Sequence, residues 1–299
     1  MTIPSNFKFI FSYLPNMSEL VTISMRNAAG ETISWKLDLE RGTATHDFIR
    51  DHLDRHVPYE PDVSGFLVRA LRPGDTFVDV GANLGWFTCL AASAVGLAGN
   101  VFAFEPGAEN VRELESNLQC NAFSNVQLVP KVVSDFAGAV DFYINGENSG
   151  GNALWDPQHF PGNAPAKTIE RIDSVTLDGY FDSRTERIRV LKIDTEGAEE
   201  KILRGAESLL RLGRIDFVVA ELHEMGLQEL GSNQMTLRNF MASIGFECYL
   251  MDYSGQYPRH IQSTVPIQSR LIVNLLFCTP QSLTQVWSRC VVNEKTLQL

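Results

Sequence analysis

FVDVGANLGWFT, residues 77–88, is an apolar run that reaches an aspartate, breaks into two glycines and then turns apolar again. The pattern predicts a buried strand, a turn at residues 81–85 and a helix that begins at Trp86. Glycine lets the backbone bend sharply there, and it lets a ligand approach the N–H groups at the start of the helix. The stretch therefore predicts a strand–turn–helix unit of an open α/β sheet with a ligand at its turn.

The rest of the chain after about residue 70 alternates short apolar segments with longer amphipathic ones. This alternation is typical of a mostly parallel sheet covered by helices on both faces, and so of an α/β fold. The expected strands are residues 76–80, 101–104, 126–133, 190–193, 217–222, 246–251 and 271–278, and the expected helices are residues 86–94, 108–118, 198–212 and 236–244.

Two regions depart from this alternation. The first sixty residues contain two strand-like runs around residues 27–30, which predict a β-hairpin outside the main sheet. Farther along, two runs with period-two patterning flank a long segment rich in glycine, asparagine and proline, residues 145–167. A loop of this length is either a functional lid or a mobile excursion. Its Trp155, His159 and Phe160 are the side chains that could touch a substrate.

The composition limits the classes of partner and compartment. The formal net charge of −11 would repel a polyphosphate backbone, so we expect no nucleic-acid partner. No apolar stretch approaches the roughly 20 residues of a membrane-spanning helix, so we expect no membrane association. Five cysteines without a CxxC pair suggest neither disulfides nor zinc, which favours a cytoplasmic protein.

The turn and an acidic residue after the next strand point to one class of ligand. The middle glycine of a dinucleotide fingerprint is replaced by Asn83, which argues against an NAD or FAD enzyme. Asp79 brings a negative charge to the turn and suits a ligand with a cationic end. Glu105, 24 residues after Gly81, lies where related folds place the acid that binds a ribose. A ligand with a ribose and a cation but no phosphate is S-adenosylmethionine.

Five motifs in this order resemble the FkbM-like family of S-adenosylmethionine-dependent class I methyltransferases, over about residues 55–280. The resemblance implies a Rossmann-like sheet of seven strands in the order 3-2-1-4-5-7-6 with the last strand antiparallel. The hairpin and the end of the chain lie outside the resemblance. We therefore expect an N-terminal extension with a hairpin and a helix over residues 1–55, a methyltransferase domain over residues 56–280 and a tail over residues 281–299. The motifs are YEP (59–61), PGDTFVDVGANLGWFT (73–88), FAFEP (102–106), VVSDFAG (132–138) and LKIDTEGAEEKILRGA (191–206).

The resemblance also assigns cofactor contacts. It implies that the turn borders the methionine part of the cofactor, that the second strand ends at its ribose and that the third strand ends near its adenine. Two residues before the first helix of the domain would close over the cofactor. The implied contacts are Asp79, Gly81, Asn83 and Gly85 at the turn, Glu105 and Pro106 at the ribose, Val133 and Ser134 near the adenine, Tyr59 and Glu60 at the closing side, and Asp194.

The catalytic candidates follow the fourth and fifth strands. Lys192 and Asp194 lie on one side of a strand whose carboxyl end should face the ligand. A hydroxyl acceptor has to lose its proton, which a carboxylate or a histidine can accept, so Glu221 and His223 are further candidates. His223 could equally be a structural strand-end residue. Asp194 and Glu221 could also hold a divalent metal such as Mg²⁺, but no third ligand is evident beside Glu221, so the metal stays open.

These observations predict a methyltransferase that acts on a hydroxyl of a small-molecule or sugar-containing metabolite, the oxygen being an inference from the resemblance. The alternatives are N-methylation by an enzyme of the same family and a non-catalytic protein that binds S-adenosylmethionine. An NAD-dependent oxidoreductase is disfavoured by Asn83. The sequence leaves the oligomeric state open.

Overall fold

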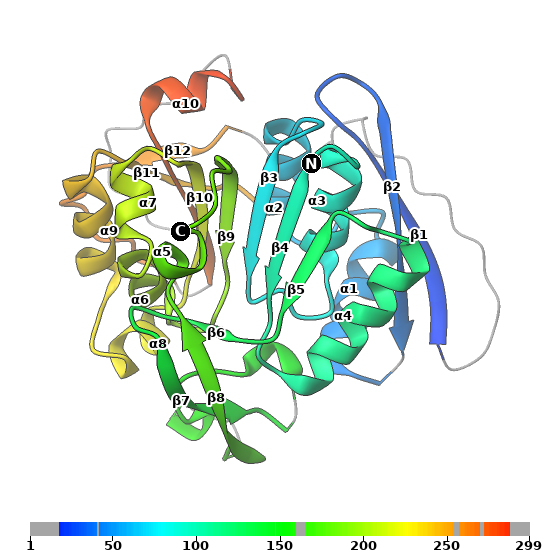
Figure 1. Cartoon of the computed structure of the whole chain (residues 1–299), viewed down its shortest axis with the longest axis horizontal. Coiled ribbons are helices and arrows are strands. Elements are labelled where there is room, and N and C mark those ends of the chain that lie inside the picture. The colour runs from blue at the N-terminus through cyan, green and yellow to red at the C-terminus, as the bar shows by residue number, and fades with distance from the viewer. Residues whose placement is uncertain are drawn as a thin grey trace.

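The computed structural model describes residues 18–40, 42–146, 148–159, 165–253, 257–269 and 272–287. Its centre is an eight-stranded sheet in the order β12-β11-β13-β10-β9-β3-β4-β5 (Figure 1). The five strands from β5 to β10 are mutually parallel, whereas β13 runs antiparallel to both of its neighbours. The strands are β3 (Thr76–Val80), β4 (Asn100–Phe104), β5 (Val126–Val129), β9 (Ile188–Ile193), β10 (Ile215–Leu222), β11 (Glu247–Leu250), β12 (Arg259–Ile261) and β13 (Val273–Cys278).

Helices cover both faces of this sheet, as predicted (Figure 1). One face packs on α2 (Pro61–Ala70), α3 (Trp86–Val95) and α10 (Pro280–Thr284), and α4 (Ala108–Asn121) lies near its edge strands. The other face packs on the helices of the second half of the chain. These are α5 (Leu177–Tyr180), α6 (Glu199–Arg204), α7 (Glu207–Arg211), α8 (Glu224–Glu229) and α9 (Gln234–Ser243).

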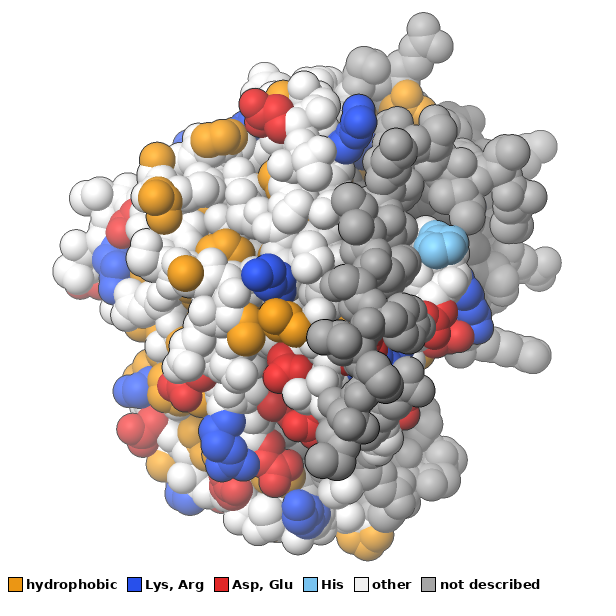
Figure 2. Space-filling model, turned by 90° about the vertical axis from the view of Figure 1, so that its right-hand side faces the viewer, with side chains coloured by type: hydrophobic (Ala, Val, Ile, Leu, Met, Phe, Trp, Pro, Cys, Tyr) orange, Lys and Arg blue, Asp and Glu red, His pale blue; other side chains and the backbone are white. Residues whose placement is uncertain are grey.

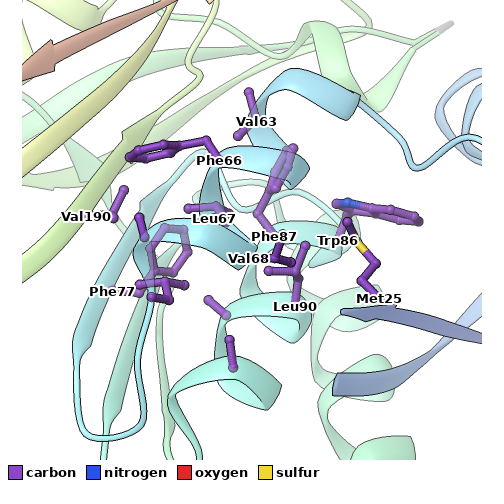
Figure 3. Close-up of a cluster of buried hydrophobic side chains, with 14 of the residues drawn as sticks. Met25, Val63, Phe66, Leu67, Val68, Phe77, Trp86, Phe87, Leu90 and Val190 are labelled. Atoms are coloured by element: carbon purple, nitrogen blue, oxygen red, sulfur yellow. The ribbon is translucent and has the colours of Figure 1, made fainter. Parts of the chain in front are cut away.

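The buried side chains of the first face form one continuous apolar cluster (Figure 3). Phe66 of α2 lies 5.4 Å from Phe217 of β10, between ring centroids, and Trp86 of α3 lies 5.6 Å from Trp35. All four rings are at most 2% exposed, so their burial contributes a large share of the hydrophobic stabilisation. This packing fixes α2 and α3, and with α3 the helix that begins directly after the glycine turn.

The predicted hairpin is present, formed by β1 (Ser18–Arg26) and β2 (Thr32–Glu40). It lies outside the main sheet, against α3 and α4 (Figure 1). Asn117 and Asn121 of α4 accept hydrogen bonds from β2 backbone N–H groups, each at 2.7 Å. The helix α1 (Ala44–Asp54) follows the hairpin. The domain limits stay a prediction, and residues 1–17 and 288–299 lie outside the described part of the chain.

The predicted strand count was wrong. The sheet has eight strands because the three-residue strand β12 pairs with β11, and its order differs from the predicted one by this added edge. The predicted strand 126–133 is also two strands in two sheets, β5 and β6 (Val132–Val133). Pro130 between them has no N–H to donate, and Lys131 N bonds Val129 O at 2.9 Å in a tight turn.

The predicted helix 198–212 is likewise divided, into α6 and α7. The break falls at Gly205, where a Cβ would lie 2.1 Å from the backbone oxygen of Ser134. The helix therefore bends where the backbone that follows β6 passes against it. The last expected strand begins at Leu271, which lies outside the described residues.

A second sheet carries the excursion at residues 145–167. It has the order β6-β8-β7, with β7 (Gly138–Ile144) antiparallel to β8 (Thr168–Val175). Figure 1 places this small sheet beyond the ends of the β3 and β4 arrows, which are the carboxyl ends of the parallel strands. The excursion between β7 and β8 starts with two short 3₁₀ turns, η1 (Ser149–Gly151) and η2 (Pro157–His159). It is thus attached to the edge where a ligand is expected.

Candidate active site

The glycine turn has the conformation that the sequence predicts. Gly81 and Gly85 have φ angles of 80° and 97°, a region that only glycine adopts readily. A Cβ on Gly81 would lie 1.8 Å from the backbone oxygen of Asp194, so the end of β9 packs directly on the turn. Asn83 also has a positive φ, 49°, which asparagine tolerates better than most residues. These angles therefore fix the backbone of the turn directly before the N-terminal end of α3.

Asp79 lies beneath this turn and not in the cavity. It is fully buried, and its Oδ2 accepts a hydrogen bond of 2.7 Å from Thr88 Oγ1. Lys192 is its register partner on β9, with Nζ 3.8 Å from Asp79 Oδ1 and 3.0 Å from Asp194 Oδ2. Burial alone would lower the pKa of Lys192, but the surrounding carboxylates raise it above its usual value. The buried lysine therefore stays charged and fixes Asp194.

Glu105 follows β4 and is held by three N–H donors. Its Oε2 accepts from Asn83 N at 2.8 Å, and its Oε1 accepts from Gly107 N at 2.9 Å and from Asn110 Nδ2 at 3.2 Å. Burial nevertheless raises the pKa of Glu105 to about 7, against the opposing effect of these donors. This carboxylate is rigidly placed at the mouth of the turn, as a ribose-binding acid should be.

A cavity lies between the turn, Glu105 and the end of β9. Its empty space, including the part open to solvent, is about 830 Å³. Nine of the predicted residues line it: Tyr59, Gly81, Asn83, Gly85, Glu105, Pro106, Val133, Lys192 and Asp194. Five do not: Glu60, Asp79, Ser134, Glu221 and His223.

The excursion supplies a wall of the cavity that the sequence did not assign in detail. Ser149, Gly150, Asn152 and Leu154 line it, and so do Thr45 and Ile49 of α1, and Asn110 of α4. Thr45 Oγ1 donates to Asn148 Oδ1 at 3.1 Å, which ties the excursion to α1. In the sequence, only the high glycine and asparagine content of the excursion indicated that it could contact a ligand.

Three carboxylates gather beside the cavity, on three separate elements. Glu60 precedes α2, Asp194 follows β9 and Glu221 is in β10, and each offers an oxygen within 4.8 Å of the other two. Oxygen atoms at this spacing could hold a divalent cation such as Mg²⁺. They could equally share protons, because burial and the neighbouring Asp194 raise the pKa of Glu60 to about 8 and that of Glu221 well above its usual value.

His223 has a structural partner on each ring nitrogen. Its Nδ1 accepts from Gly226 N at 2.9 Å, which caps α8, so the ring proton lies on Nε2, 3.3 Å from Glu196 Oε2. Trp155 of the excursion, the predicted substrate contact, donates to Glu196 O at 2.6 Å. His159 bonds Glu229, and Phe160 lies outside the described residues. The geometry therefore favours a positioning role for His223.

The stability of the protein should fall as the pH rises from 6 to 9. Burial raises the pKa of Glu60 and Glu196 from 4.5 to about 8, and that of Glu105 and Glu199 from 4.5 to about 7. The folded state therefore retains protons that the unfolded state has lost. Their stabilising effect is complete below pH 4.5 and declines by about 1.4 kcal/mol per pH unit for each such proton between pH 4.5 and the folded pKa, so it is lost once the pH has passed 7 to 8.

This trend is checked by thermal unfolding at each pH without ligand. Glu196→Gln removes one of the groups and should reduce the slope. A melting temperature that stays constant or increases between pH 6 and 9 would contradict the proposed protonation of these acids.

The fold resembles those of several solved methyltransferases, at low sequence identity. A SAM-dependent O-methyltransferase from Thermotoga maritima shares 12% identity, with a TM-score of 0.41, over 88% of this chain and 78% of that one. Precorrin-6y C5,15-methyltransferase from Geobacter metallireducens shares 13% identity, with a TM-score of 0.41, over 74% and 86%. Fibrillarin from Aeropyrum pernix, with natively bound S-adenosyl-L-methionine, shares 10% identity, with a TM-score of 0.40, over 87% and 100%.

Such similarity says nothing about the acceptor, and no curated protein matches this sequence. The methyltransferase FkbM domain, in contrast, matches residues 79–248, more than half of the chain. The match begins at Asp79 in β3 and ends in β11, so it contains the glycine turn, Glu105, Asp194 and Glu221. The chain therefore belongs to the FkbM family of S-adenosylmethionine-dependent methyltransferases.

Proposed function

We propose that this enzyme transfers a methyl group to a hydroxyl oxygen of a small-molecule or sugar-containing metabolite, and that Asp194 accepts the hydroxyl proton. The observation that carries the proposal is the place of Asp194. Its backbone oxygen packs on the glycine turn, its carboxylate lines the cavity and Lys192 holds that carboxylate at 3.0 Å. An acid is thus fixed at the methionine end of the cofactor site.

The residues of the cavity fit S-adenosylmethionine. A Cβ at Gly81 or Gly85 would strike Asp194 or Leu114, so only glycine lets the turn pack this closely on β9 and α4, and both glycines line the cavity. Glu105 offers an acidic acceptor to a ribose, and the Asp194 carboxylate, which shares its charge with Lys192 at 3.0 Å, can lie beside a sulfonium. We assign Tyr59, Gly81, Asn83, Gly85, Glu105, Pro106 and Val133 to cofactor binding.

S-adenosylmethionine supplies an electrophilic methyl carbon, so the chain has to position the acceptor and exclude water. Asp194 would hydrogen-bond the acceptor hydroxyl and aim its oxygen at that carbon. The proton would move to Asp194 Oδ, because Glu60 and Glu221 already hold protons near neutral pH, while the breaking carbon–sulfur bond leaves its electron pair on sulfur. Lys192 and His223 act as positioning residues in this scheme.

A small-molecule acceptor is supported by the charge of the protein. The net charge is −11, and described Lys and Arg side chains on the face shown in Figure 2 are dispersed among acidic ones. Such a surface offers no basic stripe to a nucleic acid on the visible, described part of that face. Within the described part of the chain, no helix has both the length and the apolar character needed to cross a membrane.

Formation of S-adenosylhomocysteine from S-adenosylmethionine tests the proposal across panels of hydroxyl compounds, amines and RNA. We expect turnover with a hydroxyl compound, and the same assay with EDTA will show whether a divalent metal at Glu60, Asp194 and Glu221 is needed. Turnover with amines or RNA alone would contradict the proposed acceptor. Cofactor binding without turnover on any panel would favour a non-catalytic binding protein.

A further inference from the structure

Asn110 carries a buried hydrogen-bond acceptor that no described residue satisfies. It lies in the first turn of α4, is 2% exposed and lines the cavity. Its Nδ2 donates to Glu105 Oε1 at 3.2 Å and to Ser149 O at 3.3 Å, whereas its Oδ1 has no partner. The amide cannot be turned over, because its oxygen would then face the Glu105 carboxylate. The unpaired oxygen is therefore a fixed feature of the site.

Hydrogen bonds from the protein occupy most of the acceptor sites of the Glu105 carboxylate. A carboxylate has about four lone-pair sites. Three of them on Glu105 are taken by Asn83 N, Gly107 N and Asn110 Nδ2, which leaves one site, on Oε2. A ribose diol brings two O–H donors, so Glu105 can satisfy only one of them. The second hydroxyl needs another acceptor in the same place.

We propose that Asn110 is that acceptor, its Oδ1 taking a hydrogen bond from the second ribose hydroxyl of the cofactor. This inference rests on the proposed function, and it adds a ribose-recognition residue to the site. A buried, unsatisfied amide oxygen is unfavourable until a donor arrives, so the ligand would gain both the new bond and the removal of that penalty. Ser149 O holds the Asn110 amide in this orientation, so the excursion contributes to the recognition.

The test compares the binding of S-adenosylhomocysteine with that of its 2′-deoxy and 3′-deoxy forms by calorimetry. Wild-type protein should bind each deoxy form about tenfold more weakly, the usual effect of one lost hydrogen bond. Asn110→Ala should bind S-adenosylhomocysteine about tenfold more weakly and should no longer discriminate against one of the two deoxy forms. Discrimination against the other form, through Glu105, should persist.

Asn125→Ala is the matched control. Asn125 also has an unpaired buried Oδ1, and its Nδ2 bonds Ala92 O and Gly96 O, but it does not line the cavity. This variant should discriminate as the wild type does. Circular dichroism verifies folding, and a second variant, Asn110→Leu, deletes the amide without adding a hydroxyl and covers the Glu105 Oε1 site that Asn110→Ala leaves open.

Two results would overturn the inference while leaving the cofactor site intact. One is that Asn110→Ala weakens all three ligands by the same factor, which is the mark of a structural effect. The other is that the wild type binds all three alike. A wild-type protein that binds none of the three would overturn the proposed function as well.

Discussion

Gly81→Ala should lower the free energy of unfolding by more than about 4 kcal/mol, an exceptional loss for the addition of one carbon. The new Cβ would lie 1.8 Å from the backbone oxygen of Asp194 and 2.9 Å from its carbonyl carbon. Relief requires β9 to move away from β3, in the centre of the sheet, where the two strands pair in parallel. The positive φ of 80° adds a further conformational penalty of about 1–2 kcal/mol.

Gly74→Ala separates these two effects. Gly74 has a φ of 91°, but its Cβ would meet nothing within 4 Å, so only the conformational penalty applies. Urea unfolding of both variants should give a loss of about 1–2 kcal/mol for Gly74→Ala and a much larger one for Gly81→Ala. Equal losses would show that β9 does not pack on the turn as described.

Asp194→Asn should reduce turnover by about 10²- to 10⁴-fold, the usual contribution of a catalytic acid or base. The amide retains the size of the side chain but cannot accept the acceptor's proton. Binding of S-adenosylhomocysteine should change by less than about tenfold, since Lys192 still has Asp79 at 3.8 Å and the turn is unchanged. Turnover and affinity are measured separately, by product formation and by calorimetry.

Asp216→Asn is the control for this substitution. Asp216 is an acid of β10 that pairs with two basic residues, Arg187 and Arg189, as Asp194 pairs with Lys192, but it does not line the cavity. Its change should affect stability and leave turnover per folded molecule within about twofold. Unchanged turnover in Asp194→Asn would remove Asp194 from the chemistry, and loss of cofactor binding in that variant would make it a binding residue.

The central strands and the turn could be predicted because their signals are local. An apolar run followed by Gly81 and Gly85 identifies a strand, a bend and a helix within twelve residues. Pro130 was an equally local signal, and it separates β5 from β6 where one strand had been predicted. Strand β12 has only three residues, so its pairing with β11 gives no recognisable pattern in the sequence.

The acidic cluster could not be predicted as a group, because its members come together only in three dimensions. Asp194 follows β9 and Glu221 lies near the end of the adjacent strand β10, as the sequence suggests. Glu60, however, precedes α2 and is far from both of them in the sequence. Asn110 reads in the sequence as an ordinary polar helix residue. Its importance depends on the Glu105 carboxylate and on Ser149, which is 39 residues away.

The most direct test of the central claim is a crystal structure of the protein with S-adenosylhomocysteine bound. We predict that the ribose hydroxyls contact Glu105 and Asn110, and that the sulfur lies between the Gly81–Gly85 turn and Asp194. The ligand bound elsewhere, or a turn filled by protein side chains when the ligand is present at saturation, would contradict this account.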